Sequence, residues 1–269
     1  MTTAPEQTPE GWNPGAEPYA EVFAPFTGAF AADAIERLGM SAGDAALDVA
    51  AGTGAFSLRA AALGARVLAT DFAPGMLDEL RRRAAAADLA VETAVMDGQA
   101  LDLATDTFDV AASIFGVIFF PDADAGLREL ARVTRPGGRM AVTSWSDDGP
   151  RLGKLTAAAV TAADPTVELP VRRVHAPLGT PDGCHATLTA NGWRDVEVVE
   201  LRHDLMVEDP PAFFRSMVQW SAPARPIVAM LDADGRERAA AAFTDAVAGY
   251  SPTGDRVPFH GLLSIGAPA

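Results

Sequence analysis

The sequence predicts an α/β fold with a doubly wound sheet, and three observations lead to this prediction. Between residues 45 and 145, short apolar runs alternate with segments of helical periodicity. Strands that alternate with helices pair in parallel and carry helices on both faces, since the crossovers are right-handed. A loop with two glycines, residues 50–54, joins the first apolar run to the first helix. Two further strand-like runs near the end of the chain bring the expected number of strands to seven.

The first half of the chain divides into five strands and three helices. We expect strands at 45–50, 66–70, 90–95, 108–114 and 139–145, and helices at 55–63, 75–87 and 123–134. Gly64 ends the first helix, and Pro74 opens the second, since proline favours the first helical position. Pro136-Gly137-Gly138 ends the third helix and leads into the fifth strand.

The second half of the chain is richer in helix. It predicts helices at 152–163, 181–190, 210–220 and 235–248, and strands at 195–201 and 257–265. Residues 164–180 contain Pro165, Pro170 and Pro177 and predict a loop or lid. We therefore expect an N-terminal helical lid segment at 1–40, and a ligand-binding domain at 41–269 with a lid insertion at about 150–180.

Composition and charge exclude several classes of protein. The formal net charge of -15 opposes binding to the phosphate backbones of nucleic acids and to anionic membranes. Cys184 is the one cysteine, so neither an internal disulfide nor a cysteine-based zinc site can form. Lys154 is the one lysine, and we expect it at the surface. Residues 1–18 lack the features of a signal peptide, so we expect a cytoplasmic enzyme.

The glycine loop and two acids indicate an adenosine cofactor. The segment ALDVAAGTG at 46–54 places Asp48 before Gly52 and Gly54, and Asp71 follows the second strand. An acid at the tip of the second strand can accept hydrogen bonds from both ribose hydroxyls. Ser57 stands where the dinucleotide fingerprint has its third glycine. Asp48 would repel a pyrophosphate but attract an α-ammonium group, so S-adenosylmethionine (SAM) is favoured over NAD.

Five segments in order carry a resemblance to a known family. They are LDVAAGTG (47–54), ATDFAPGML (69–77), MDGQALDL (96–103), FDVAASIFGVIFFPD (108–122) and RVTRPGGRMAV (132–142). Together they resemble the class I SAM-dependent methyltransferases, in the subgroup related to the ubiquinone/menaquinone-biosynthesis (methyltransferase type 11) enzymes. The resemblance implies a Rossmann-like, mostly parallel seven-stranded sheet with an antiparallel last strand. Ala50-Ala51 departs from relatives, which often carry Gly or Cys there.

The resemblance also implies roles for individual residues. Asp48, Gly52 and Gly54 would cradle the methionine moiety of SAM, and Asp71 would hold the ribose. Residues expected near the adenine and the sulfonium are Phe72, Met76, Asp97, Gly98, Gln99, Ser113 and Ile114. Arg132 and Pro136-Gly137-Gly138 belong to a structural turn into the fifth strand.

The sequence says less about the side of the site that would bind the methyl acceptor. Aromatic residues expected in the substrate pocket are Tyr19, Phe23, Phe115 and Phe119, although core packing explains at least one of them equally well. His175, in the proline-rich lid, is the candidate general base, since its pKa would suit proton transfer near neutrality. His185, His203 and His260 are weaker candidates. The histidines lack the spacing of a metal site, so we expect no metal.

These observations predict a methyltransferase that uses SAM to methylate a small, largely apolar metabolite in specialised, natural-product biosynthesis. A second hypothesis keeps the fold and SAM without methyl transfer, as in a cyclase or a SAM-binding regulatory module. An NAD(P)-dependent oxidoreductase is disfavoured by Ser57 and by the absence of a Tyr-x-x-x-Lys pair.

Overall fold

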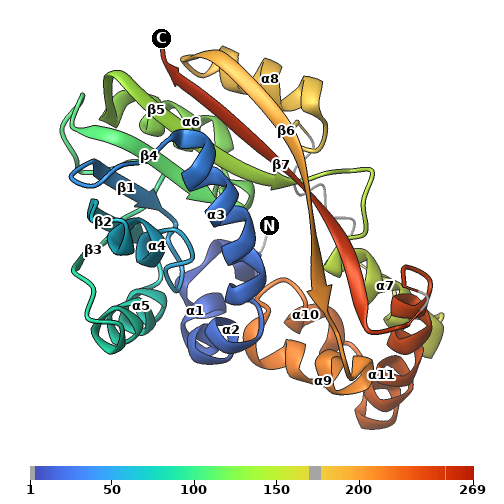
Figure 1. The fold of residues 1–269 in the computed structure, drawn as a ribbon. Helices are drawn as coiled ribbons and strands as arrows, with labels where there is room; N and C mark the ends of the chain where they lie inside the picture. Colours follow the sequence, from blue (N-terminus) through green and yellow to red (C-terminus); the bar gives the residue numbers. More distant parts are fainter. Residues whose placement is uncertain (1–3, 170–176, 252) are drawn as a thin grey trace.

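A computed structural model describes residues 4–169, 177–251 and 253–269. It contains a seven-stranded sheet in the order β3-β2-β1-β4-β5-β7-β6. The strands from β3 to β5 pair in parallel, and β7 runs antiparallel to both β5 and β6. This arrangement confirms the predicted doubly wound sheet and its antiparallel last strand (Figure 1).

The first four strands and their helices lie close to the predicted boundaries. The strands are β1 (Ala45–Val49), β2 (Arg66–Asp71), β3 (Val91–Val95) and β4 (Phe108–Ile114). The connecting helices are α4 (Ser57–Ala62), α5 (Pro74–Ala86), η3 (Val117–Phe119) and α6 (Ala123–Val133). Asp122 caps α6 by accepting a hydrogen bond from the Ala125 amide.

Strand β5 (Thr134–Trp145) begins earlier than predicted, because the Pro136-Gly137-Gly138 turn is part of it. The side chain of Arg132 holds the chain in place before this turn. Its guanidinium donates to the carbonyl oxygens of Leu101 and Leu103 and pairs with Glu129. The arginine thus ties α6 to the loop before β4, in agreement with the structural role implied for it.

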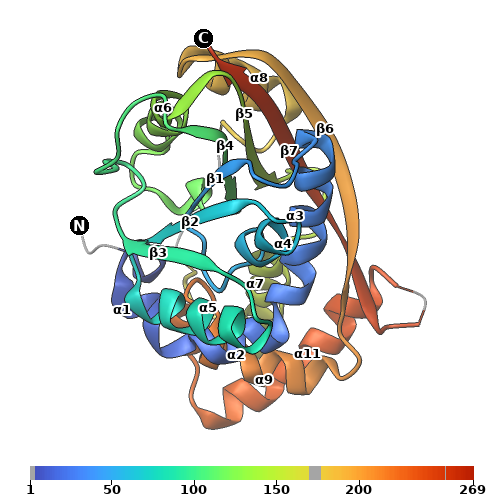
Figure 2. The same cartoon turned by 60° about the vertical axis from the view of Figure 1, so that its left-hand side comes forward.

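Alternating residues of the central strands pack against helices on opposite faces. Ala46 lies in one buried cluster with α4 and with α3 (Ala24–Leu38), whereas Leu47 lies in another with α6 and with α8 (Pro181–Ala190). Figures 1 and 2 show α3 and α4 on one face of the sheet and α6 and α8 on the other. Helix α3 therefore packs against the sheet, although it falls inside the expected lid segment 1–40.

The last two strands are longer than predicted. Strand β6 spans Trp193–Met206 and β7 spans Arg256–Pro268, and they pair from Trp193 with Pro268 to Met206 with Arg256. The resulting ribbon carries α9 (Pro210–Trp220), α10 (Arg225–Val228) and α11 (Ala233–Ala248) at its far end (Figure 1). There α11 packs against α7 (Leu152–Ala163), the helix that follows β5.

The N-terminal segment is folded back over the carboxyl ends of the strands. It contains η1 (Pro5–Gln7), α1 (Pro9–Trp12), η2 (Asn13–Gly15) and α2 (Ala16–Val22). The Gly75 amide at the start of α5 donates to the Asn13 side chain at 2.8 Å. None of the described helices is long and apolar enough to span a membrane.

Candidate cofactor and acceptor site

A cavity of about 640 Å³ lies at the carboxyl ends of the parallel strands. This is where open α/β sheets place their ligands, and the volume lies in the usual range of about 300–1,000 Å³ for ligand pockets. Its walls come from the loops after β1 to β5, from the N-terminal segment, from the start of α7 and from α9 and α10. Segments far apart in the sequence thus enclose one space.

Asp48 is the penultimate residue of β1, lies beneath the glycine loop and is 1% exposed. Its Oδ2 accepts hydrogen bonds from the Ser57 amide at 3.1 Å and the Ser57 hydroxyl at 2.6 Å. Burial raises the pKa of Asp48 to about 7, and the two bonds from Ser57 oppose this shift. Ser57, the residue that breaks the dinucleotide fingerprint, therefore orients this carboxylate. A cationic ligand group would recover the solvation that Asp48 has lost.

Asp71 ends β2 and ties two loops together. Its Oδ2 accepts from the Gly52 amide at 2.8 Å, and its Oδ1 accepts from the Ala73 amide at 2.9 Å. Burial raises the pKa of Asp71 to about 6, against the lowering effect of these backbone bonds. The carboxylate lines the cavity and fixes the glycine loop at the same time.

The loop after β3 contributes a third acid. Asp97 is exposed and accepts hydrogen bonds from the backbone and side-chain amides of Gln99, both at 2.9 Å. Gly98 is buried, and a Cβ there would lie 2.5 Å from Phe120 and 2.7 Å from Val49. A larger residue at this position would displace the side chains of Phe120 and Val49, because the loop passes close to the end of β1 and to the turn after η3.

Two non-glycine residues at the rim have left-handed backbone conformations. Ala50, directly after β1, has φ 55°, and Phe115, directly after β4, has φ 57°. Such conformations cost about 1–3 kcal/mol and gather at functional sites, where the surrounding structure enforces them. Both residues line the cavity, so the strain lies where a ligand would bind.

The strain at Ala50 leads to a stability prediction. Ala50→Gly is expected to raise the free energy of unfolding by up to about 1 kcal/mol, since glycine adopts φ > 0 without steric cost. Ala61→Gly, in the last turn of α4, is the matched control and should lower it by up to about 1 kcal/mol. Urea unfolding without ligand measures both, and equal losses in the two variants would contradict the backbone conformation given for Ala50.

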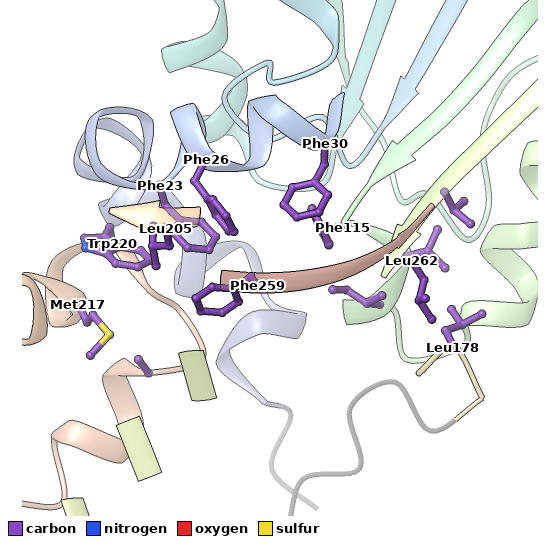
Figure 3. Close-up of a cluster of buried hydrophobic side chains, with 14 of the residues drawn as sticks. Phe23, Phe26, Phe30, Phe115, Leu178, Leu205, Met217, Trp220, Phe259 and Leu262 are labelled. Atoms are coloured by element: carbon purple, nitrogen blue, oxygen red, sulfur yellow. The ribbon is translucent and has the colours of Figure 1, made fainter. Parts of the chain in front are cut away.

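Aromatic residues form the other half of the cavity. Phe115 stacks on Trp145 with ring centroids 3.8 Å apart, and Phe23 stacks on Trp220 at 5.1 Å. Figure 3 shows Phe23 and Trp220 face to face, close to Phe26. Tyr19 contacts both members of the second pair. All of these rings except Phe26 line the cavity.

Tyr19 is a hydrogen-bond donor at neutral pH. Burial raises its pKa to about 12, the Thr27 hydroxyl opposes the shift, and the Asp71 carboxylate adds to it. The phenol therefore keeps its proton, which excludes Tyr19 as a general base near neutrality.

Charge changes sign across the cavity. Asp97, Asp71 and Asp48 follow β3, β2 and β1, which are neighbours in the sheet. Phe115 and Trp145 follow at β4 and β5, and Arg151 and Lys154 line the cavity beyond β5. The acidic end would take a cationic ligand, and the aromatic surfaces beside it would favour a positive centre through cation–π attraction.

Comparison with known proteins agrees with this geometry. Residues 46–138 match the family model of a methyltransferase domain. The chain is 40% identical over 111 residues to the demethylmenaquinone methyltransferase of Corynebacterium glutamicum, covering 41% of this chain and 46% of that enzyme. The chain therefore contains a methyltransferase domain at residues 46–138. The acids of β1 and β2 that line the cavity fit S-adenosyl-L-methionine as its cofactor.

Two further comparisons define the extent of the likeness. Over 115 residues the chain is 44% identical to an uncharacterized protein of Mycobacterium tuberculosis, covering 43% of this chain and 42% of that protein. The match thus spans less than half the length of these curated relatives. The crystal structure of the Bacillus subtilis YcgJ protein has the same fold, with a TM-score of 0.59 and 16% identity over 88% of this chain and 96% of that one.

The structure brings most of the expected cofactor residues together. Those lining the cavity are Asp48, Gly52, Asp71, Phe72, Met76, Asp97, Gly98, Gln99 and Ile114. Gly54, at the end of the glycine loop, does not line the cavity, and a Cβ there would be 2.9 Å from Leu80 of α5. Ser113 is fully buried behind the wall and accepts a hydrogen bond from the Val117 amide, so it shapes the turn after β4 and does not line the cavity.

In the part of the chain that the structure describes, no histidine is placed to act as a base at the site. His175 lies outside those residues. His185 is exposed on α8, and His203 is paired with Asp33 at 2.6 Å. His260 lies 3.2 Å from Glu200. None of these three lines the cavity.

Sequence reasoning considered Trp220 only as a possible cap of the pocket and did not place the helices between β6 and β7 over the cavity. Trp220, Ala224 and Ile227 line the cavity from α9, from the residue before α10 and from α10, although the lid was expected from 1–40 and 150–180. The helical periodicity of α9 was visible in the sequence, whereas α10 was not predicted. Their position over the strand ends depends on the ribbon of β6 and β7, and both strands are longer than the sequence pattern predicted.

Proposed function

We propose that this chain transfers the methyl group of SAM to a small molecule with a largely apolar body. The observation that carries the proposal is the single cavity that joins the buried acids Asp48 and Asp71 to an aromatic wall. SAM, with its α-ammonium and its ribose, fits the acidic end. An acceptor at the aromatic end would then lie next to the methyl group.

In the proposed mechanism, the protein positions the reactants and excludes water. SAM supplies a methyl group that its sulfonium already activates. Asp48 would hold the ammonium and Asp71 the ribose, which fixes the direction of the S–CH₃ bond. Phe115 and Trp145 would orient the acceptor for in-line attack, and the cover of α2, α9 and α10 would keep water out. Orientation of this kind supplies effective molarities of about 10⁵ M or more.

We propose that the lid consists of residues 4–23, α7 with residues 164–169 after it, and α9–α10. These segments lie outside residues 46–138, so they would adapt the common domain to its own acceptor. An acceptor from specialised, natural-product biosynthesis is in keeping with a cover so largely aromatic and apolar.

The alternative is a SAM-binding protein of this fold that does not transfer methyl groups, such as a cyclase. Incubation with SAM labelled in the methyl group and with fractionated small-molecule extracts separates the two. Mass spectrometry should detect S-adenosylhomocysteine together with a labelled product. SAM binding without S-adenosylhomocysteine formation in any fraction would favour the alternative.

The acceptor half is tested through Trp220. Trp220→Leu is expected to lower kcat/KM for the identified acceptor about tenfold or more, because the stacked pair with Phe23 is lost and small misplacements of the acceptor are costly. The Kd of SAM, measured by calorimetry, should stay within about twofold, since Trp220 lies at the aromatic end. An equal loss in both quantities would place Trp220 at the cofactor. A melting curve verifies that the variant is folded.

A further inference from the structure

Two cations line the acceptor end of the cavity. Among the cavity-lining residues that the structure describes, Arg151 and Lys154 are the basic ones. Arg151 lies six positions after the end of β5, and Lys154 lies in the first turn of α7. The chain has a net charge of -15 and a single lysine, so the placement of two cations in a cavity whose other charged lining residues are acids is unexpected.

Arg151 is held in place by its own loop. Its guanidinium donates to the carbonyl oxygens of Ser146 at 3.1 Å and Trp145 at 3.3 Å, and it pairs with Asp147. These contacts engage both the Nε and the Nη2 atoms. Arg151 therefore stabilises the turn from β5 to α7, its charge is shared with Asp147, and its Nη1 donors are not used in these contacts.

Lys154 is the more available cation. Its Nζ donates to the Asp147 carbonyl at 3.4 Å, a long hydrogen bond, and the side chain is exposed. Asp147 uses its carboxylate for Arg151, and no carboxylate lies within ion-pair distance of Lys154 in the described parts of the chain. An ammonium has three donors, so Lys154 retains the capacity to bind an anion.

The start of α7 adds to this positive end. Leu152, Gly153 and Lys154 all line the cavity, and Arg151, the N-cap residue, does not cap the helix with its side chain. The first amides of this 12-residue helix are thus available to a ligand, and the helix dipole favours an anion there. A Cβ at Gly153 would meet nothing within 4 Å, so the space beside these amides is open.

The order of the strands separates this positive end from the cofactor end. Strand β5 is two positions from β1, and neighbouring strands are about 4.8 Å apart. The carboxylate of SAM lies on the same carbon as its ammonium, which the proposed function places at Asp48 after β1. The cations beyond β5 therefore face the acceptor, with Phe115 and Trp145 between the two ends.

We propose that the acceptor is an apolar, ring-containing molecule with one carboxylate, and that Lys154, Arg151 and the first amides of α7 bind this carboxylate. The inference rests on the proposed function and specifies its substrate class. The rings lie against Phe115, Trp145 and Trp220, and the carboxylate points toward α7. This arrangement fixes the acceptor at both ends and presents an intermediate atom to the methyl group.

The test uses matched pairs of aromatic carboxylates and their primary amides, from benzoate and benzamide to 2-naphthoate and 2-naphthamide and to three-ring analogues. Binding to the full chain saturated with S-adenosylhomocysteine is followed by the fluorescence of Trp145 and Trp220. At least one carboxylate should bind about tenfold tighter than its amide, because a charge-assisted bond to Lys154 is lost in the amide. The preference should fall as salt increases.

Three variants complete the experiment. Lys154→Gln should reduce the carboxylate preference to about twofold or less, and Lys154→Arg should keep most of it. Arg202→Gln removes the same charge from the exposed face of β6 and should leave the preference unchanged. S-adenosylhomocysteine affinity should be the same in all four proteins.

Each contrary result has a distinct meaning. If no carboxylate binds tighter than its amide, the inference is overturned even though the cofactor binds. A loss of S-adenosylhomocysteine affinity in Lys154→Gln would assign the cation to the cofactor and also overturn it. Failure of the wild type to bind S-adenosylhomocysteine would count against the proposed function itself. Equal loss of preference in Arg202→Gln would show a long-range charge effect and no carboxylate site.

Discussion

Asp71→Ala is expected to weaken SAM binding by about 2 kcal/mol or more, which is roughly thirtyfold in Kd. The carboxylate would accept hydrogen bonds from the ribose, and bonds to a charged acceptor are worth about 1.5–3 kcal/mol. It also anchors the amides of Gly52 and Ala73, so its removal frees the glycine loop. Calorimetric titration with SAM and with S-adenosylhomocysteine measures the loss.

Two controls separate the contributions of Asp71. Asp71→Asn keeps one oxygen that can accept a hydrogen bond but removes the charge, so its loss of affinity should lie between those of the wild type and Asp71→Ala. Asp78→Asn changes an acid on the exposed face of α5, paired with Arg81, and should leave the affinity unchanged. Unaltered SAM affinity in Asp71→Ala would mean that the ribose does not bind at the end of β2.

Asp48→Asn is expected to act in opposite directions on binding and stability. The variant should bind SAM at least about tenfold more weakly, because a buried charge facing the α-ammonium is lost. The protein without ligand should become more stable, by about 2 kcal/mol or more. The reason is that above pH 7 the wild type carries an ionised carboxylate that is 1% exposed and that accepts hydrogen bonds from Ser57 alone among the described residues.

The pH dependence of stability follows from the raised pKa of Asp48. The pKa of Asp48 is about 7 in the folded chain against an ordinary value of 3.8. Between these values the folded state binds more protons than the unfolded state, so this group lowers stability as pH rises from about 4 to 7. Above pH 7 the cost is fully present, and below about pH 4 it is absent. Asp71, with a pKa of about 6, acts in the same direction.

SAM affinity should show the reverse trend, because only the ionised carboxylates attract a cation. We expect affinity to fall as pH drops from 8 to 5.5, and the fall should be smaller in Asp48→Asn. Thermal melts and calorimetry across this range measure both effects. Parallel pH profiles for stability and affinity in the wild type would contradict the burial of an ionised Asp48.

A control variant is available at Asn191, which is buried like Asp48 but does not line the cavity. Asn191→Asp should lose stability without a change in SAM affinity.

The fold and the cofactor end of the site follow from the sequence alone. Strand and helix periods are local properties, and so are the turn at Gly52 and Gly54 and the acids that end β1 and β2. In a parallel sheet the carboxyl ends of consecutive strands meet at one edge, so Asp48, Asp71 and Asp97 could be brought together from their positions in the chain. The charge of Asp48, shortly before the glycine loop, similarly favours SAM over a pyrophosphate.

The surroundings of the acceptor, in contrast, depend on tertiary packing. Trp220 is 75 residues from Trp145 in the sequence, yet both line the same cavity, because the β6–β7 ribbon carries α9 and α10 back over the strand ends. Ser113 was expected at the wall from its position at the end of β4, but strand alternation turns it into the core. Lys154 is exposed, as a lone lysine is expected to be, and its place at the mouth of the cavity depends on the path from β5 to α7. Long-range packing determines such positions, and residue periodicity carries no information about it.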